Sequence, residues 1–226
     1  MRVDNTSAGL SILAACTTDV KQWYMQNGLQ LNPDKSEALF MGTATQFRAL
    51  SSLTSVSVAD VDLPVADSMR VLGVTLDCRL TFDNHASAVA RSCNYHARAI
   101  RHIRHLLTLA QTLACSLILS RIDYCNSVLY SAPSGTIQKL QRVQNNAARI
   151  VLQAPRRSDV SSLLRTLHWL PVEQRINYKL AVLTFKTQQT SSPQYLNQHI
   201  SLRNSARNTR SSSVPPLCGC LDFSYH

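Results

Sequence analysis

Residues 83–107 read DNHASAVARSCNYHARAIRHIRHLL, and this stretch predicts how the second half of the chain folds. Apolar residues and one histidine recur in it at alternating steps of four and three, which is the spacing of one face of an α-helix. These residues are Val89, Cys93, His96, Ile100, Ile103 and Leu107. Asp83 is a candidate N-cap, because an aspartate accepts hydrogen bonds from the first free N–H groups of a helix. The stretch therefore predicts a long helix with one packed face.

A second face of the same predicted helix is polar and largely cationic. Its members are Arg91, Asn94, Arg98, Arg101 and His105. Another long helix is predicted around residues 137–151, and its polar face comprises Lys139, Arg142, Asn146 and Arg149, continued by Arg156 and Arg157. Arginine presents a planar fork of donors that matches phosphate oxygens. We therefore expect the basic residues of these two faces to contact the backbone of a nucleic acid.

The charge of the chain is divided unevenly between its two halves. The 226 residues contain 23 Lys and Arg against 13 Asp and Glu, a net charge of +10, and 18 of the basic residues are Arg. Residues 1–90 carry a net charge of −3, whereas residues 91–226 carry +13. A half this basic points to nucleic acid or to another anionic surface. The alternative is a solvated basic face with no partner.

Composition excludes several classes of protein. Hydrophobic residues make up 45% of the chain, which is enough for a packed core. No run approaches the roughly 20 consecutive apolar residues of a membrane span, so no membrane association is expected. The seven cysteines are odd in number and scattered, which favours an intracellular location, nuclear or cytoplasmic, over secretion. Cys218 and Cys220 form the one close pair, so we expect no metal or cofactor site in this chain.

The predicted fold class is α+β. Residues 1–82 form a small mixed piece, in which a helix ending at Gly28 is followed by a strand at 37–42, a loop at 43–54 and a strand at 69–77. Gly73 suggests a bulge or a close backbone approach inside the last strand. Residues 83–200 are helical, with further helices near 110–122, 159–167, 172–189 and 193–200. Residues 201–226 have the composition of a disordered basic tail.

Five blocks of sequence, taken in order, match a known family. They are WYMQNGLQLNPDKSE at 23–37, LGVTLD at 72–77, SRIDYCNSVLY at 120–130, KLQRVQNNAAR at 139–149, and LHWLPV at 167–172 with Arg175 and Ile176. Together they resemble the reverse transcriptase of non-LTR, LINE-type retrotransposons of the jockey-like groups. The resemblance covers about residues 8–200 and lies in the C-terminal part of that enzyme.

The resemblance implies a right-hand polymerase that copies RNA into DNA with Mg²⁺. Residues 1–82 then correspond to the end of the palm, with residues 69–77 resembling the strand that grips the primer, and residues 83–200 to the helical thumb and its extension. Lys35 falls where the family carries a lysine near the triphosphate, so it is a possible accessory residue. The expected partner is an RNA/DNA duplex or a nucleic-acid backbone.

The carboxylates that such a polymerase needs are not evident. Nucleotidyl transfer uses metal ions held by acidic side chains, which the family supplies as an adjacent Asp-Asp pair. No two acidic residues are adjacent in this sequence, and the nearest substitutes, Asp60 and Asp62, follow residues 32–35 instead of preceding them. We therefore expect a truncated, catalytically inactive fragment of a mobile-element reverse transcriptase that keeps nucleic-acid binding. The alternative is a domesticated nucleic-acid-binding or protein-interaction module without enzymatic activity.

Overall fold

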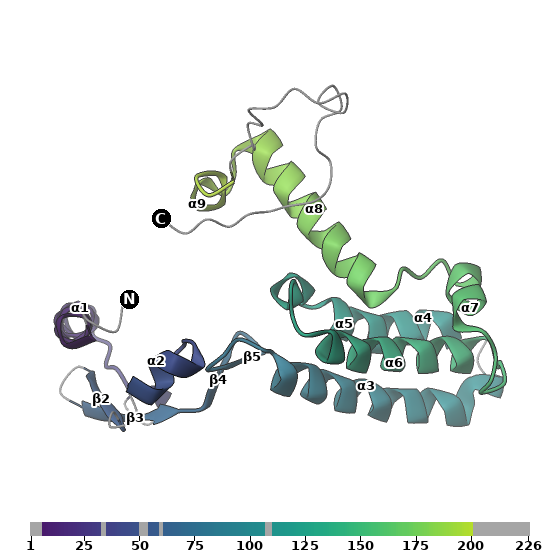
Figure 1. The fold of residues 1–226 in the computed structure, drawn as a ribbon, viewed down its shortest axis with the longest axis horizontal. Helices are drawn as coiled ribbons and strands as arrows, with labels where there is room; N and C mark the ends of the chain where they lie inside the picture. The colour runs from purple at the N-terminus through teal and green to yellow at the C-terminus, as the bar shows by residue number, and fades with distance from the viewer. Residues whose placement is uncertain (1–5, 33–34, 50–53, 59–60, 107–109, 201–226) are drawn as a thin grey trace. The chain divides into compact units, whose positions relative to one another are not determined.

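A computed structural model describes residues 6–32, 35–49, 54–58, 61–106 and 110–200. The chain divides into two compact units, Met1–Ala88 and Val89–His226. Among the described residues, the first unit holds the strands, two helices and the start of a third, and the second is helical (Figure 1), so the predicted α+β class is confirmed. The tail predicted at residues 201–226 lies outside the described residues.

The first unit begins with helix α1 (Thr6–Gln26), which ends as its sequence predicts. Gly28 has a φ of +71°, and the N–H of Leu29 donates to the carbonyl of Tyr24 at 2.8 Å. This is the left-handed closure that glycine permits at a helix C-terminus, because glycine has no Cβ. Much of α1 is exposed, including the side chains of Ile12 and Trp23.

The strands of the first unit form two small sheets. In the three-stranded sheet, β3 (Val61–Ala66) lies between β1 (Ala38–Leu39), which is parallel to it, and β2 (Ser55–Val58), which is antiparallel. Val56 and Leu63 are opposite each other in the β2–β3 pair and are both buried. The other sheet is the antiparallel pair β4 (Ser68–Val71) and β5 (Val74–Asp77).

The loop expected at residues 43–54 is partly wrong, because a short helix, α2 (Ala44–Ala49), lies within it. The Gln46 side chain accepts from the Thr43 N–H at 2.7 Å, and Thr43 Oγ1 accepts from the Gln46 N–H at 3.5 Å. This reciprocal arrangement is a capping box, in which Thr and Gln three residues apart satisfy each other's backbone donors. The Thr-x-x-Gln spacing was present in the sequence as the signal for this helix.

The single strand expected at residues 69–77 is also wrong, since the stretch folds back on itself as β4 and β5. Leu72 and Gly73 connect the two strands with φ values of +47° and +84°. Two consecutive residues with positive φ form the type I′ turn, whose twist suits a two-residue hairpin. Gly73 is therefore a turn residue and not a bulge, and Leu72 is exposed at the tip.

Asp77 organises the segment between β5 and helix α3 (Asp83–Ile103). Its carboxylate accepts from the backbone N–H and hydroxyl of Thr81, both at 3.0 Å, and from the N–H of Phe82 at 2.7 Å. Burial raises the pKa of Asp77, but these hydrogen bonds outweigh it and hold the pKa below its usual value. Asp83, expected as the N-cap, is instead the first helical residue.

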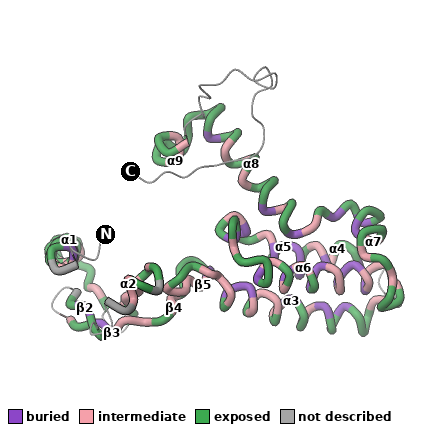
Figure 2. Tube along the Cα trace, in the orientation of Figure 1, coloured by how far each residue is buried: buried purple, intermediate pink, exposed green. Residues whose placement is uncertain are grey.

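Three helical segments form the core of the second unit. The first is α3, and the second comprises α4 (Ala110–Ala114), the π-helical segment η4 (Cys115–Leu119) and α5 (Ser120–Asp123). The third is α6 (Ser134–Val151), which follows the 3₁₀ turn η5 (Asn126–Leu129). Figure 1 shows α3 and α6 running in the same direction and α4–α5 running back between them in chain order. Their inward faces are buried (Figure 2), with Ile118, Ile122 and Leu140 among the largest fully buried side chains.

The second unit ends with α7 (Val160–Thr166), α8 (Val172–Thr190) and α9 (Gln194–Asn197). Asp159 caps α7 by accepting from the N–H groups of Ser161 and Ser162, and these bonds lower its pKa. Trp169 is buried at the corner before α8, and Pro171 lies just before that helix. Among the described helices, none combines the length and the apolar character needed to cross a membrane.

Candidate nucleic-acid interface

Helix α3 places its cationic face in solvent. Arg91, Arg98 and Arg101 are all exposed, while Cys93 and Ile100 on the other side of the helix are buried. The thiol of Cys93 points to the carbonyl of Ile118 in the π-helical segment, with a sulfur–oxygen distance of 3.7 Å. Burial raises the pKa of Cys93 to about 11, so this thiol stays neutral. The apolar side of α3 is therefore anchored, and its arginines lie on the solvent side of the helix.

Helix α6 has the same division into two sides. Leu140, Val143 and Ala147 are buried, whereas Arg142 is exposed and Lys139 and Arg149 are half-buried. The Nε of Arg149 is buried without a hydrogen-bond acceptor in the described part of the chain. Part of this guanidinium is therefore desolvated and unsatisfied, which is uncommon in folded proteins.

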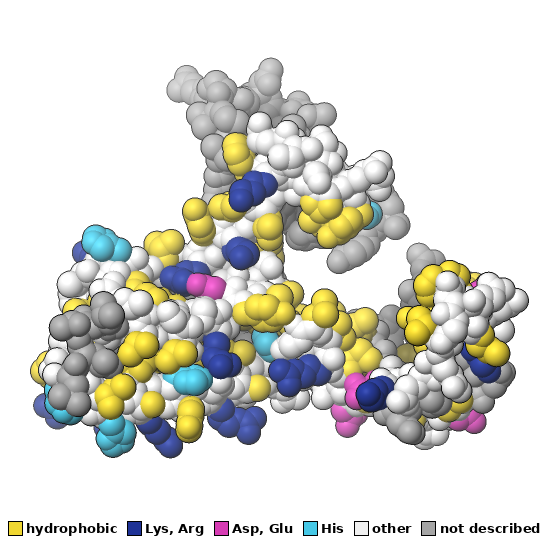
Figure 3. Space-filling model, turned by 180° about the vertical axis from the view of Figure 1, so that it is seen from behind, with side chains coloured by type: hydrophobic (Ala, Val, Ile, Leu, Met, Phe, Trp, Pro, Cys, Tyr) yellow, Lys and Arg dark blue, Asp and Glu magenta, His cyan; other side chains and the backbone are white. Residues whose placement is uncertain are grey.

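One contact joins the two cationic faces. The Nη2 of Arg101 on α3 donates to Oδ1 of Asn146 on α6 at 2.9 Å. Because the two helices run in the same direction, Arg98 and Arg142 each lie about one turn before this contact, and Arg149 lies one turn after it on α6. We call the combined surface of Arg91, Arg98, Arg101, Lys139, Arg142 and Arg149 the basic face. Figure 3 shows Lys and Arg side chains spread over this unit, with histidines among them.

Among the described residues, Asp83 is the one acidic residue on α3 or α6, and it lies about two turns before Arg91. The described acidic residues of the second unit are Asp123, Asp159 and Glu173, and they lie outside these two helices. Asp123 is paired with Arg175, and Asp159 accepts backbone N–H groups of α7. Within the described residues, no carboxylate forms an ion pair with Arg91, Arg98 or Arg142. The positive charge of these three arginines is therefore not neutralised by an ion pair within this part of the chain.

Three other predicted residues lie elsewhere. Arg156 and Arg157 are exposed, but α6 ends at Val151, so they belong to the turn after the helix and do not continue its face as expected. Lys35 is exposed in a short turn, where its N–H donates to the carbonyl of Asn32 at 3.2 Å. A role for Lys35 in chemistry stays a prediction.

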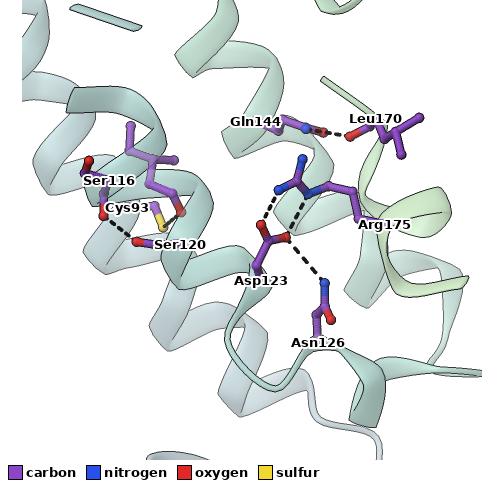
Figure 4. A network of polar contacts seen from close by, with 9 residues as sticks. Cys93, Ser116, Ser120, Asp123, Asn126, Gln144, Leu170 and Arg175 are labelled. Atoms are coloured by element: carbon purple, nitrogen blue, oxygen red, sulfur yellow. Dashed lines mark hydrogen bonds and ion pairs between the residues drawn. The ribbon is translucent and has the colours of Figure 1, made fainter. Parts of the chain in front are cut away.

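A polar network at the base of α8 was missed by sequence reasoning (Figure 4). Arg175 binds Asp123 through two hydrogen bonds, of which the Nε–Oδ1 bond is 2.7 Å long, and Nδ2 of Asn126 lies 3.4 Å from the same Oδ1. Beside it, the fully buried Gln144 donates to the carbonyl of Leu170 at 2.8 Å. These bonds attach the start of α8 to α5 and α6. The partners in the Asp123–Arg175 and Gln144–Leu170 bonds are 52 and 26 residues apart, so no local sequence pattern could predict these bonds.

The part of the chain that the structure describes brings together no set of carboxylates of the kind that holds Mg²⁺ for nucleotidyl transfer. In the described ranges, no group of three or more His, Cys, Asp and Glu side chains comes together to hold a metal ion. Asp62 is exposed on β3, and Asp60 lies outside the described residues. No catalytic step through a metal ion follows from these side chains.

Over most of its length the chain is similar to a transposon RNA-directed DNA polymerase. The relative found is similar rather than identical in sequence: the "Probable RNA-directed DNA polymerase from transposon BS" of Drosophila melanogaster matches with 28% identity over 171 residues. The matched region covers 71% of this chain but 18% of the fly protein, so the chain spans about a fifth of that relative. No family model matches, and no solved structure matches. The expected resemblance to a retrotransposon polymerase is thereby confirmed.

Proposed function

We propose that the helical unit binds the sugar-phosphate backbone of nucleic acid through the basic face, and that the residues of this chain do not themselves catalyse nucleotidyl transfer. The observation that carries the first part is the Arg101–Asn146 hydrogen bond, which joins two arginine-bearing helix faces into one surface. The name of the fly relative, an RNA-directed DNA polymerase, supports a nucleic-acid partner. An RNA/DNA duplex is the form of partner that such a polymerase produces.

The chemistry of the basic face suits phosphate. Each guanidinium offers several N–H donors in a plane, and an arginine without a carboxylate partner gives up little on binding a phosphate oxygen. Neutralising phosphates releases condensed cations from the duplex, so affinity falls with salt in proportion to the number of contacts. The apolar anchoring of α3 and α6 holds the backbone of the site in place before binding.

Salt dependence tests the binding proposal quantitatively. If Arg98, Arg101, Arg142 and Arg149 each contact one phosphate, the logarithmic slope of affinity against salt should be about −3.6, and affinity should fall about 150-fold between 50 and 200 mM salt. The measurement is fluorescence anisotropy with a labelled RNA/DNA duplex. Arg98→Gln should make the slope shallower by about 0.9.

Lys179→Gln is the matched control, because it removes one exposed cation from α8, away from the basic face. This variant should keep the slope of the parent chain. A flat salt response of the parent, or equal slopes for Arg98→Gln and the parent, would contradict binding through the basic face.

The second part of the proposal, that this chain does not itself catalyse nucleotidyl transfer, rests on the carboxylates available to hold a metal ion. A primer–template duplex, deoxynucleotides and Mg²⁺ or Mn²⁺ should yield no extension by the purified chain, because the described residues bring no set of carboxylates together. Metal-dependent extension of the primer would overturn this part while leaving the binding proposal intact.

A further inference from the structure

An exposed tyrosine lies within the basic face, on α3. Tyr95 follows Arg91 by four residues and precedes Arg98 by three, so the three side chains are neighbours on one side of the helix. Its side chain is 72% exposed, although a tyrosine on a packed helix ordinarily buries much of its ring. Arg91 and Arg98 are separated by about 10 Å along the helix axis, and the Tyr95 ring is placed between these two cations.

The ring of Tyr95 makes an edge-to-face contact with the ring of His96 and is not stacked on it. The centroids of Tyr95 and His96 are 5.4 Å apart with an angle of 79° between the rings. An edge-to-face contact of this kind covers at most one face of the tyrosine ring. With the side chain this exposed, a flat aromatic surface is open to solvent between two guanidinium groups.

We propose that Tyr95 stacks on an unpaired base of a single-stranded nucleic acid whose backbone is held by Arg91 and Arg98. The inference rests on the proposed function, since it names what kind of nucleic acid the basic face takes at this end. In a duplex both faces of a base are covered by its neighbours, whereas an unpaired base has a face to offer to an aromatic side chain. Flanking cations attract the phosphates on either side of that base.

The positive charge of Arg91 and Arg98 and the flat ring of Tyr95 together indicate which class of ligand binds here. A protein partner with an apolar surface would leave Arg91 and Arg98 desolvated without a counter-charge, which is costly. A polynucleotide satisfies both requirements, because it offers flat bases together with a negatively charged backbone.

Binding of single-stranded oligonucleotides by Tyr95 variants tests the proposal. Tyr95→Ala should weaken binding of a mixed-sequence 12-mer about 5- to 150-fold, which is the range for loss of one stacked base. It should leave the affinity for a blunt duplex within about twofold and the salt slope unchanged, because tyrosine neutralises no phosphate. Tyr95→Phe should keep single-strand binding, because the ring and not the hydroxyl makes the contact.

Tyr178→Ala is the matched control, since it removes a tyrosine that is 64% exposed on α8, where the nearby Arg175 is engaged by Asp123. Equal losses for RNA and DNA 12-mers are expected, because every base has a ring face. Equal single-strand affinities for Tyr95→Ala and Tyr178→Ala would overturn the stacking proposal even where the salt response of the basic face holds. A flat salt response of the parent chain would instead overturn the proposed function.

Discussion

Loss of the Arg175 guanidinium should detach the start of α8 from α5. Arg175 donates twice to Asp123, and the side chains are 20% and 35% exposed, respectively. A fully exposed pair contributes about 0.2–1 kcal/mol, and breaking a fully buried one costs about 3–5 kcal/mol. A half-buried pair with two charge-assisted bonds lies between these limits, so Arg175→Gln should lower the unfolding free energy by about 2 kcal/mol.

Tryptophan fluorescence during urea unfolding measures this effect in the helical unit. The chain has two tryptophans, and Trp169 is buried next to the base of α8 whereas Trp23 lies exposed in the first unit. A Trp23→Phe background therefore reports the helical unit alone. In that background Asp123→Asn should cost about as much as Arg175→Gln, and the double variant should cost about 2–3 kcal/mol, which is less than the sum of the two.

The double-mutant cycle gives the decisive number. We expect a coupling energy between Asp123 and Arg175 of about 1–2 kcal/mol, because the two side chains share their hydrogen bonds. Lys179→Gln is the control for loss of charge on α8 and should change stability by less than about 0.5 kcal/mol. Additive effects of the two single variants, within about 0.5 kcal/mol, would refute the ion pair as the attachment and leave the burial of Val172 and Ile176 in that role.

Two further predictions concern the first unit. Leu72→Asn should stabilise the β4–β5 hairpin by about 1 kcal/mol, because Leu72 is 85% exposed at a φ of +47° that asparagine tolerates better. Thermal melting measures this gain. A melting temperature of the variant no higher than that of the parent would contradict the type I′ turn. Burial and the neighbouring Arg70 lower the pKa of His85, whose Nδ1 accepts from the Thr75 N–H at 3.4 Å. The unfolded chain therefore binds more protons below pH 6.5, so the unfolding free energy should fall as the pH drops below that value. His85→Asn should flatten this pH dependence of urea unfolding, and an unchanged profile would count against the buried neutral histidine.

The helices of the second unit could be predicted from sequence because their signal is local. The apolar residues of α3 and α6 recur every three or four positions, and the helix ends carry their own markers, such as Asp159 before α7. The exposure of Arg91, Arg98 and Arg101 follows from the same periodicity, since the packed side of a helix leaves the other side to solvent. The Thr43–Gln46 capping box was equally local, so α2 was within reach of the sequence.

The turn at Leu72–Gly73 could not be predicted from the local sequence alone. An apolar run with one glycine fits a bulged strand and a hairpin equally well, and the choice depends on which residues pair across it. Here Met69 pairs with Leu76 and Val71 with Val74, which makes the run a hairpin.

Two long-range pairings decided the rest of the candidate site. By itself the sequence determined that two helices carry cationic faces and that the positive charge gathers in the second half of the chain. Only the tertiary structure brought Arg101 to Asn146 and Arg175 to Asp123, across 45 and 52 residues of chain. The physical reason is that periodicity sets which side of a helix is buried, whereas the packing of the whole unit sets which helices become neighbours.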